Sequence, residues 1–401
     1  MKVFGAFLLA AVCAYAALPP MTIVADEEAD PIRSAINRKE TWTLDPARRL
    51  RSDAERRMTQ GPWSVTFDRP VGVALDSHDY YSEAPYYWLN PIDPTGPYVL
   101  REDHLNPDRF SANRTALESM SNAVFTLGTA AYLFDDARYA QRAARIVQTW
   151  FINPKTRMNP NLESAGAIRG LNTGRPAGIA EGRVFIRAIQ GMEFLERTGN
   201  WDPKEREAVR KWFEEYLRWL TQSKSGLEEK TSGNNQASWW TAQVAAVATF
   251  LEDRPATKMI FDFYRGHIFP RQIRADGSAP REEARPLWYS VFNVEAFTMI
   301  CRIAEVQGVN LWDVRGRNGS TLSTVIDYLE PNLADPRKWS REQISELDKE
   351  GLYFLAFAGM GLKKPQYLSL YQKLEAPGGA WLSLVDLLAN RWEAAGHQTR
   401  R

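Results

Sequence analysis

An asparagine-rich segment at the start of a predicted helix carries residue types that bind a carboxylate. Residues 232–240 read Ser-Gly-Asn-Asn-Gln-Ala-Ser-Trp-Trp, and the helix is expected over 235–251. Because the N-terminus of a helix is electropositive, Asn234, Asn235 and Gln236 are candidates for holding an anionic group. The alternative is ordinary helix capping by Asn234 or Asn235, since asparagine is a common N-cap residue.

Two tryptophans, Trp239 and Trp240, come directly behind these amides. Flat aromatic rings stack on the faces of sugar rings, so both are candidates for contacting a glycan. The chain has 14 tryptophans, and packing in the core explains most of them.

A second polar segment places Arg285 four residues before Tyr289. Arginine binds a carboxylate in bidentate fashion, and a cation beside a phenol favours loss of its proton. An ion pair of Arg285 with Glu282 or Glu283, and simple packing of Tyr289, are the alternatives. Amide, guanidinium and phenol together suit β-elimination from a 4-linked uronate. That reaction needs a neutralised carboxylate, a base for the C5 proton and an acid for the leaving oxygen.

Two long loops combine aromatic and polar residues in the manner of a substrate subsite. They span residues 85–107 and 159–175, and either could also be a structured connection. The candidate binding residues in them are Tyr87, Trp88, Arg101, His104, Asn172 and Arg175.

Composition and periodicity indicate a globular, nearly all-helical chain. It has 401 residues, of which 44% are hydrophobic and 25% charged, with a net charge of +1. This balance argues against nucleic acid as a partner, since that requires a basic surface. Apolar residues recur at helical spacing, while 63–67 and 98–100 are the best strand signals. The predicted helices are 114–133, 136–151, 183–197, 203–220, 235–251, 256–269, 290–306 and 341–357.

The N-terminus has the pattern of a secretory signal peptide over residues 1–17, with a short apolar run and small residues at its end. We therefore expect a secreted protein without membrane attachment after cleavage. Residues 18–60 are read as an N-terminal extension, and 61–401 as a single domain. Sequons for N-glycosylation begin at Asn113 and Asn318.

Metal and hydrolase chemistry have less support in the sequence. The four histidines, His78, His104, His267 and His397, are scattered without ligand spacing, so no metal or other cofactor is expected. The adjacent carboxylates Glu282 and Glu283 are compatible with a glycoside hydrolase, although neighbouring acids on a turn are commonly just solvated.

Taken in order, the motifs resemble the alginate lyase superfamily, polysaccharide lyase families five and thirty-eight. The resemblance covers roughly residues 85–300. It consists of Tyr87-Trp88 with Asn90-Pro91, Gly96-Pro97-Tyr98, Asn106-Pro107, Asn172-Thr173-Gly174-Arg175, Gly233-Asn234-Asn235-Gln236, Asp276-Gly277-Ser278, Glu283-Ala284-Arg285 and Tyr289-Ser290-Val291-Phe292-Asn293.

This resemblance implies an all-α, incomplete α/α toroid and metal-free β-elimination of an acidic polysaccharide. Asn235 and Arg285 would neutralise the substrate carboxylate, and Tyr289 would be the catalytic acid. Family five has a histidine where this chain has Gln236, and glutamine cannot take up a proton. Tyr289 would then act as both base and acid, which fits syn elimination and makes family thirty-eight the nearer likeness.

The expected substrate is alginate, chiefly its mannuronate-rich regions, or a β-1,4-linked glucuronan. The spacing from Arg285 to Tyr289 is shorter than the family pattern, so the arginine carries the weaker assignment. Two other functions remain open on the sequence: an inverting glycoside hydrolase of the same fold class, and a non-catalytic glycan-binding protein.

Overall fold

The computed structural model describes residues 18–102, 104–341, 343, 347–374 and 378–396. The predicted signal peptide lies outside the described residues. Within them, no helix combines the length and the apolar character that crossing a bilayer requires.

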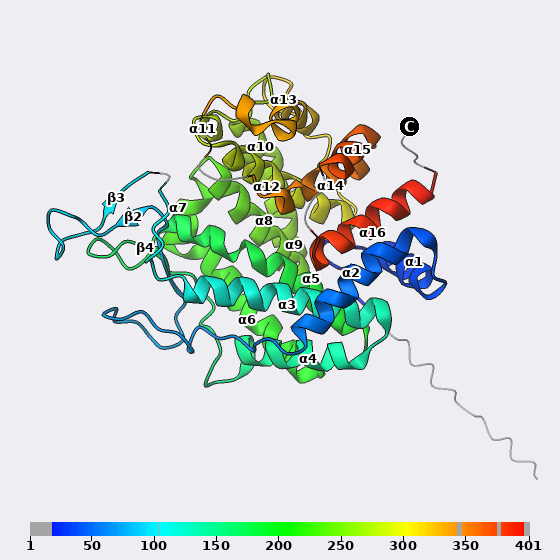
Figure 1. Ribbon diagram of the computed structural model, residues 1–401, viewed down its shortest axis with the longest axis horizontal. Coiled ribbons are helices and arrows are strands. Elements are labelled where there is room, and N and C mark those ends of the chain that lie inside the picture. The colour runs from blue at the N-terminus through cyan, green and yellow to red at the C-terminus, as the bar shows by residue number, and fades with distance from the viewer. Residues whose placement is uncertain (1–17, 103, 342, 344–346, 375–377, 397–401) are drawn as a thin grey trace, which may run out of the picture.

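Six helices form the inner ring of an α/α toroid (Figure 1). Each contacts the next along the chain, and the last returns to contact the first. They are largely buried because neighbours surround them, as in α8, where every residue from Ala237 to Phe250 is buried. The inner helices are α3 (Ala112–Phe134), α5 (Phe185–Arg197), α8 (Asn235–Phe250), α12 (Leu287–Val306), α14 (Tyr353–Gly361) and α16 (Ala380–Ala394).

A second set of helices packs on the outside of this ring and buries one face only. In α6, for example, the buried residues are spaced three or four apart and charged side chains fill the other face. The outer set comprises α4 (Ala137–Val147), α6 (Pro203–Gln222), α9 (Arg254–Phe263), α13 (Leu322–Ala334) and α15 (Pro365–Lys373).

The residues before 61 also form helices that pack on the ring. Helix α1 (Asp26–Asn37) contacts α3, and α2 (Thr41–Arg57) contacts α16 and α3. Ahead of them, residues 21–24 form a buried N-terminal strap. The Thr22 N–H and hydroxyl donate to Glu193 at 2.8 and 2.7 Å, and Arg302 donates to the Ile23 carbonyl at 2.8 Å. The strap therefore ties α5 to α12.

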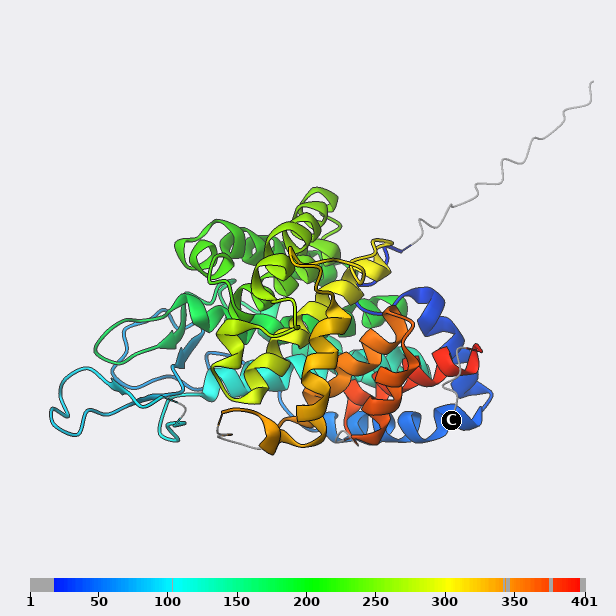
Figure 2. The ribbon, with the colours of Figure 1, turned by 90° about the horizontal axis from the view of Figure 1, so that it is seen from above.

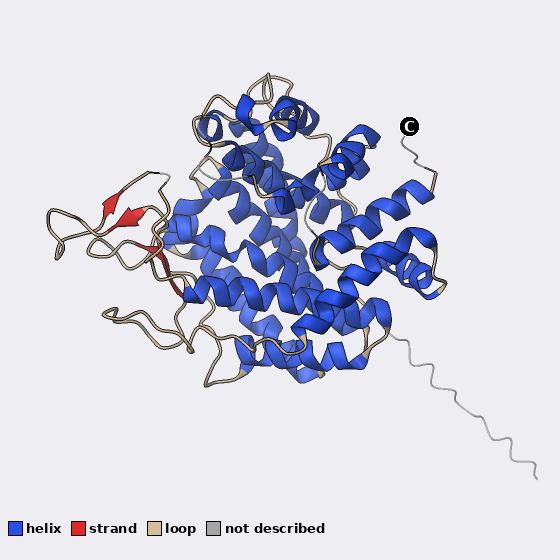
Figure 3. Ribbon diagram, in the orientation of Figure 1, coloured by secondary structure: helices blue, strands red, loops and turns tan. Residues whose placement is uncertain are grey.

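Short strands and long loops gather at one end of the molecule (Figures 2 and 3). Strands β1 (Tyr81–Glu83) and β4 (Ser164–Ala167) pair in parallel, and β2 (Tyr87–Trp88) and β3 (Val99–Leu100) pair antiparallel. The remaining short elements are η1 (Gln148–Ile152), η2 (Pro176–Val184), α7 (Lys224–Lys230), η3 (Tyr264–Ile268), α10 (Phe269–Gln272), α11 (Pro280–Glu283), η4 (Pro336–Lys338) and η5 (Lys349–Leu352).

The predicted all-α toroid is confirmed, and three local predictions are wrong. Residues 63–67 lie in coil and a turn and not in a strand. Of the helix expected over 341–357, residues 342 and 344–346 lie outside the described residues, 341, 343, 347 and 348 are not helical, and the α-helix begins at Tyr353 after a 3-10 turn. The first sequon is not usable in the folded chain. Its Asn113 side chain is fully buried and its amide donates to the Val65 and Asp68 carbonyls.

Candidate active site

A cavity of about 960 Å³ opens between the loop-rich end and the ring. Its walls come from the N-termini of α8 and α12, from η2 and α5, and from the loops around β2 and β3. Asn234, Asn235, Gln236, Arg285 and Tyr289 all line it, so the two polar segments singled out in the sequence meet in one place.

Tyr289 lies in the first turn of α12 and is held on several sides. Arg285 Nη2 donates to the tyrosine hydroxyl at 3.1 Å, and the hydroxyl of Tyr86 lies 3.3 Å away. The ring stacks on Trp288 with centroids 3.8 Å apart, while the Arg285 guanidinium lies 4.8 Å from its centroid. A cation bonded to the phenol oxygen stabilises negative charge there when the proton leaves.

The two asparagines at the start of α8 have different partners, which shows which of them is the N-cap. The Asn234 side chain is the cap and accepts from the Gln236 N–H at 3.2 Å, with Gly233 at φ +72° turning the chain before it. Asn235 instead donates its N–H and its Nδ2 to the two oxygens of Glu282, at 2.6 and 2.8 Å. Asn235 is therefore positioned by a carboxylate and is not needed as the cap.

Glu282 is itself almost fully buried, with 2% of its surface exposed. Burial raises the pKa of Glu282, and the hydrogen bonds from Asn235 and the nearby Arg285 and Arg281 oppose that rise. The Glu282 side chain thus contacts the side-chain amide of Asn235, which the sequence analysis assigns to substrate binding.

Arg285 does not make the ion pairs that were considered as alternatives. Glu282 is occupied by Asn235, and Glu283 pairs with Arg274 at 3.0 Å and accepts from Tyr328 at 2.9 Å. Arg285 pairs with Glu102, which is on the loop after β3. The guanidinium thus bridges a carboxylate at the rim of the cavity and the phenol inside it.

Comparison with known proteins gives a consistent result. Residues 66–339 match the family model described as alginate lyase. The chain belongs to the alginate lyase family. Members of this family are polysaccharide lyases, and so is this protein. No curated protein matches the sequence.

Solved structures agree with the family match. An alginate lyase from Bacteroides ovatus is 27% identical, with a TM-score of 0.85, and the alignment covers 92% of this chain and 99% of that one. Alginate lyase A1-III from Sphingomonas species A1 is 15% identical with a TM-score of 0.55, covering 85% and 96%. A variant of A1-III complexed with a tetrasaccharide is 16% identical with a TM-score of 0.56, covering 88% and 92%. The A1-III structures share the fold.

Several predicted binding residues of the lyase also reach the cavity. Tyr87 comes from β2 and Arg175 from the residue before η2, and the Arg175 guanidinium lies 5.5 Å from the centre of the Tyr87 ring. Trp239 lines the cavity too, but only 3% of it is exposed and its indole N–H donates to the Phe292 carbonyl at 2.9 Å. Trp239 therefore forms part of the cavity wall, and its ring is too buried to stack on a sugar.

The structure does not bring the other predicted binding residues to the cavity. Trp240 is buried in the core, where its indole donates to the Leu220 carbonyl at 2.9 Å. Trp88, Arg101 and His104 form their own cluster on the β2–β3 loops. Arg101 lies over the Trp88 ring at 4.9 Å, and the indole donates to the His104 carbonyl at 2.9 Å.

Asn172 shapes its own loop, since its side-chain oxygen accepts from the Ile168 N–H at 3.0 Å. Its role is the tight turn after β4, and it does not line the cavity.

Sequence reasoning missed part of the cavity lining because the residues lacked a local signal. Tyr86 directly precedes the predicted residue Tyr87, and Arg281 directly precedes the acidic pair Glu282 and Glu283. The cavity also extends to residues on α3, η2, α5 and the middle of α12, where they looked like ordinary helix. The polar lining residues that the sequence does not single out include Tyr86, Glu102, Arg114, Glu118, Glu181, Arg183, Arg187, Arg281, Glu295, Asp348 and Glu350.

Proposed function

We propose that this protein is a secreted lyase that cleaves alginate, chiefly at mannuronate, by β-elimination. The alternative substrate is a β-1,4-linked glucuronan, which is also a uronic-acid polymer. The observation that carries the proposal is the hydroxyl of Tyr289, bonded to Arg285 in the cavity that also holds Asn235 at the start of α8. The family match supports the same chemistry.

The substrate carboxylate binds between Asn235, Gln236 and Arg285. Asn235 Nδ2 donates one of its two N–H groups to Glu282, which leaves the second N–H for the substrate carboxylate. Arg285 contributes the charge, and the incoming carboxylate competes with Glu102 for it. Withdrawing charge from the carboxylate in this way makes the C5 proton of the uronate acidic.

Tyr289 removes that proton and returns one to the leaving oxygen at C4. Gln236 stands beside the site but cannot take up a proton, so the tyrosine serves both steps. One group acting as base and then acid reaches both atoms from one face of the sugar. This favours syn elimination, and hence mannuronate over guluronate.

Absorbance of the new 4,5 double bond tests the proposal on polymannuronate, glucuronan and polyguluronate. We expect the strongest signal on polymannuronate. Reducing ends without the chromophore would identify a hydrolase, and binding without either product would identify a glycan-binding protein. Both results contradict the proposal.

Tyr289→Phe removes the hydroxyl and keeps the ring. We expect kcat to fall by at least about 100-fold, the range for loss of a general acid or base, with little change in oligosaccharide binding. Tyr98→Phe is the matched control, because Tyr98 lies on a nearby loop outside the cavity lining. Unchanged turnover in Tyr289→Phe would remove this residue from the mechanism.

A further inference from the structure

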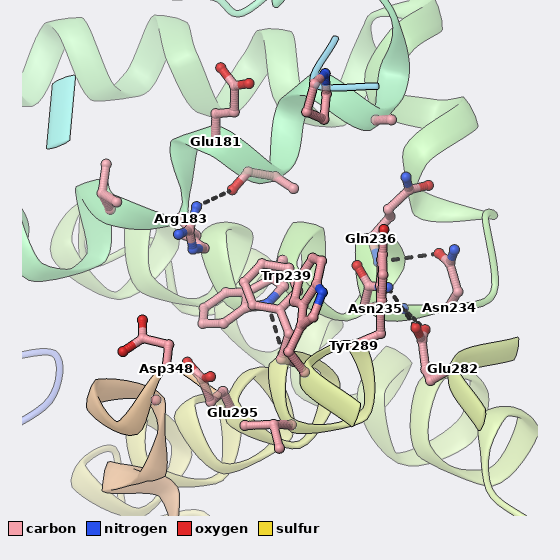
Figure 4. Close-up of a pocket in the computed structure, with 18 of the residues that line it drawn as sticks. Glu181, Arg183, Asn234, Asn235, Gln236, Trp239, Glu282, Tyr289, Glu295 and Asp348 are labelled. Carbon is pink, nitrogen blue, oxygen red and sulfur yellow. Dashed lines mark hydrogen bonds between the residues drawn. The ribbon is translucent and has the colours of Figure 1, made fainter. Parts of the chain in front are cut away.

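The cavity continues past Tyr289 along one face of α12. Tyr289, Phe292 and Glu295 all line it at intervals of three residues, which places them on the same side of the helix. From Tyr289 to Glu295 the helix rises by about 9 Å, at 1.5 Å per residue. Figure 4 shows Tyr289, Asn235 and Glu282 at one end of the pocket, and Arg183, Glu295 and Asp348 at the other. The proposed chemistry uses only the first end.

Arg183 is a cation at the far end whose charge has no carboxylate bonded to it. It lies in the last turn of η2 and is only partly exposed, with its guanidinium 5.1 Å from the centre of the Phe292 ring. Its hydrogen bond goes to the Ala180 carbonyl at 3.5 Å, and among the described residues no acid lies within ion-pair distance of it. Burial lowers the pKa of Arg183, as expected for a guanidinium taken out of water in this way.

Glu295 is the acid that faces the same part of the cavity. Its carboxylate has no hydrogen-bond partner among the residues that the structure describes. Gly351 makes room for it, because a Cβ there would lie 2.2 Å from Glu295 Oε1. Burial raises the pKa of Glu295 to about 8, against the lowering effect of Arg183 and Arg187. At neutral pH this side chain is mostly a neutral hydrogen-bond donor.

Other charges at this end are largely committed to partners. Arg187 pairs with Glu350, Arg114 pairs with Glu118 at 3.1 Å, and Glu181 accepts from Ser82 at 2.8 Å. The charged or titratable groups that face Glu295 from its neighbours are Arg183 of η2, Arg187 of α5, Asp348 and Glu350 at η5, and Tyr353 of α14.

We propose that Arg183 and Glu295 form a second carboxylate subsite, which holds another uronate of the same polymer chain. Arg183 supplies the charge that pairs with the carboxylate, and protonated Glu295 donates a hydrogen bond to it. Between the two carboxylate sites lie Phe292 and Trp239, whose ring centroids are 5.1 Å apart, as an apolar wall for the intervening sugar. This inference rests on the proposed function for the identity of the sugar.

The subsite makes binding of long substrates sensitive to pH. Above about pH 8, Glu295 loses its proton and its charge repels the uronate that Arg183 attracts. Affinity for oligouronates that reach the subsite therefore falls as pH rises through this range. The shortest cleaved oligomer does not reach it and keeps its affinity.

The test measures KM and kcat for a length series of oligouronates. For Arg183→Gln we expect KM to rise about tenfold on oligomers long enough to reach the subsite, with kcat unchanged and short oligomers unaffected. Arg183→Lys keeps the charge and should recover part of the loss. Arg254→Gln, an exposed arginine of α9 outside the cavity, is the matched control. Glu295→Gln stays neutral, so its KM at about pH 9 should match its value at about pH 7, unlike the wild type.

The outcomes separate this inference from the proposed function. Equal effects of Arg183→Gln at every length, or no effect, would overturn the subsite while elimination stands. If the wild type produces no unsaturated ends, calorimetry with the same oligouronates decides. If the oligouronates bind more weakly to Arg183→Gln than to the wild type and the control variant, the subsite is supported. If they bind equally to all variants, the subsite is overturned.

Discussion

Glu282 shows how a single buried carboxylate can set the geometry of the site. It accepts from both the backbone and the side chain of Asn235, although 47 residues separate the two in sequence. The sequence identified Asn235 and Tyr289 by their types and by their places at helix starts. It could not identify what orients them, because Glu282 looked like half of a solvated acidic pair.

The same limit explains the partner of Arg285. The sequence offers a local ion pair with Glu282 or Glu283 as the alternative for Arg285, whereas the structure pairs Arg285 with Glu102, 183 residues away. Residue types and helix starts are encoded locally, so candidates could be chosen from the chain. Pairing between distant segments depends on how the loops fold over the ring. Local sequence patterns do not predict that folding.

Replacing Glu282 by glutamine tests its positioning role. The new amide NH₂ would face one of the two donors of Asn235, so Asn235 loses its fixed orientation. We expect kcat to fall about 10-fold to 100-fold, in the range for a misplaced donor at a developing charge, with KM changed less. Steady-state kinetics and thermal melts should be measured together.

Glu283→Gln is the control for that variant, because this neighbour bonds to Arg274 and Tyr328 outside the cavity. Its kcat should stay close to wild type. If the two variants lose activity equally, the orientation of Asn235 is not what matters.

At the scale of elements, helical periodicity was informative wherever a helix packs on the ring. The predictions for 114–133, 203–220 and 235–251 agree with α3, α6 and α8 to within a few residues. The failure at 341–357 has a tertiary cause. The Gln343 side chain accepts from the Leu287 N–H at 3.1 Å, and the Trp339 indole donates to the Arg285 carbonyl at 2.8 Å. These contacts with the start of α12 hold Trp339 and Gln343 outside a helix, although the local sequence favours one.

The crossing of α3 and α5 depends on two helical glycines that looked unremarkable in the sequence. A Cβ on Gly128 would lie 2.0 Å from the Gly191 carbonyl oxygen, and a Cβ on Gly191 would lie 2.5 Å from Phe125 Cα. Both obstacles are backbone atoms, so a side chain on either glycine would push the two helices apart.

Gly191→Ala should therefore lower the free energy of unfolding by about 1–3 kcal/mol, the usual cost of overpacking. Gly266→Ala is the control, because nothing lies within 4 Å of the added Cβ and alanine favours helix by up to about 1 kcal/mol. Chemical denaturation of the two variants measures the difference. A stabilised Gly191→Ala would mean that the helices separate without cost.

For the molecule as a whole, the raised pKa values of carboxyls inside the fold link stability to pH, and Glu193, Glu229 and Glu295 show large rises among the described residues. Burial raises the pKa of Glu193 to about 7, and that of Glu229 and Glu295 to about 8. In the unfolded chain such groups titrate at about 4.3. Between these limits the folded state binds more protons than the unfolded state. The contribution of these three groups to the free energy of unfolding therefore falls as pH rises from about 4.5 towards 8.

Glu229→Gln isolates one of these groups. Glu229 is 1% exposed and its Oε1 has no hydrogen-bond partner within the described part of the chain, so a neutral amide should be tolerated. We expect the variant to gain stability over wild type by about a few kcal/mol at most, with the gain larger at about pH 8 than at about pH 5. Thermal melts at both values check this. A gain that does not depend on pH would contradict the proton linkage.

The contact of α16 with α3 has a consequence for how the chain is made. The ring is sealed by its last described helix, while the cavity already draws its walls from β2 through α14. During synthesis the earlier helices leave the ribosome with an open seam, and their apolar flanks stay uncovered until α16, which is translated after them, packs on α3. Assembly of a working cleft is thus a late event in translation, and a ribosome that stalls before residue 380 would release a product with an exposed seam.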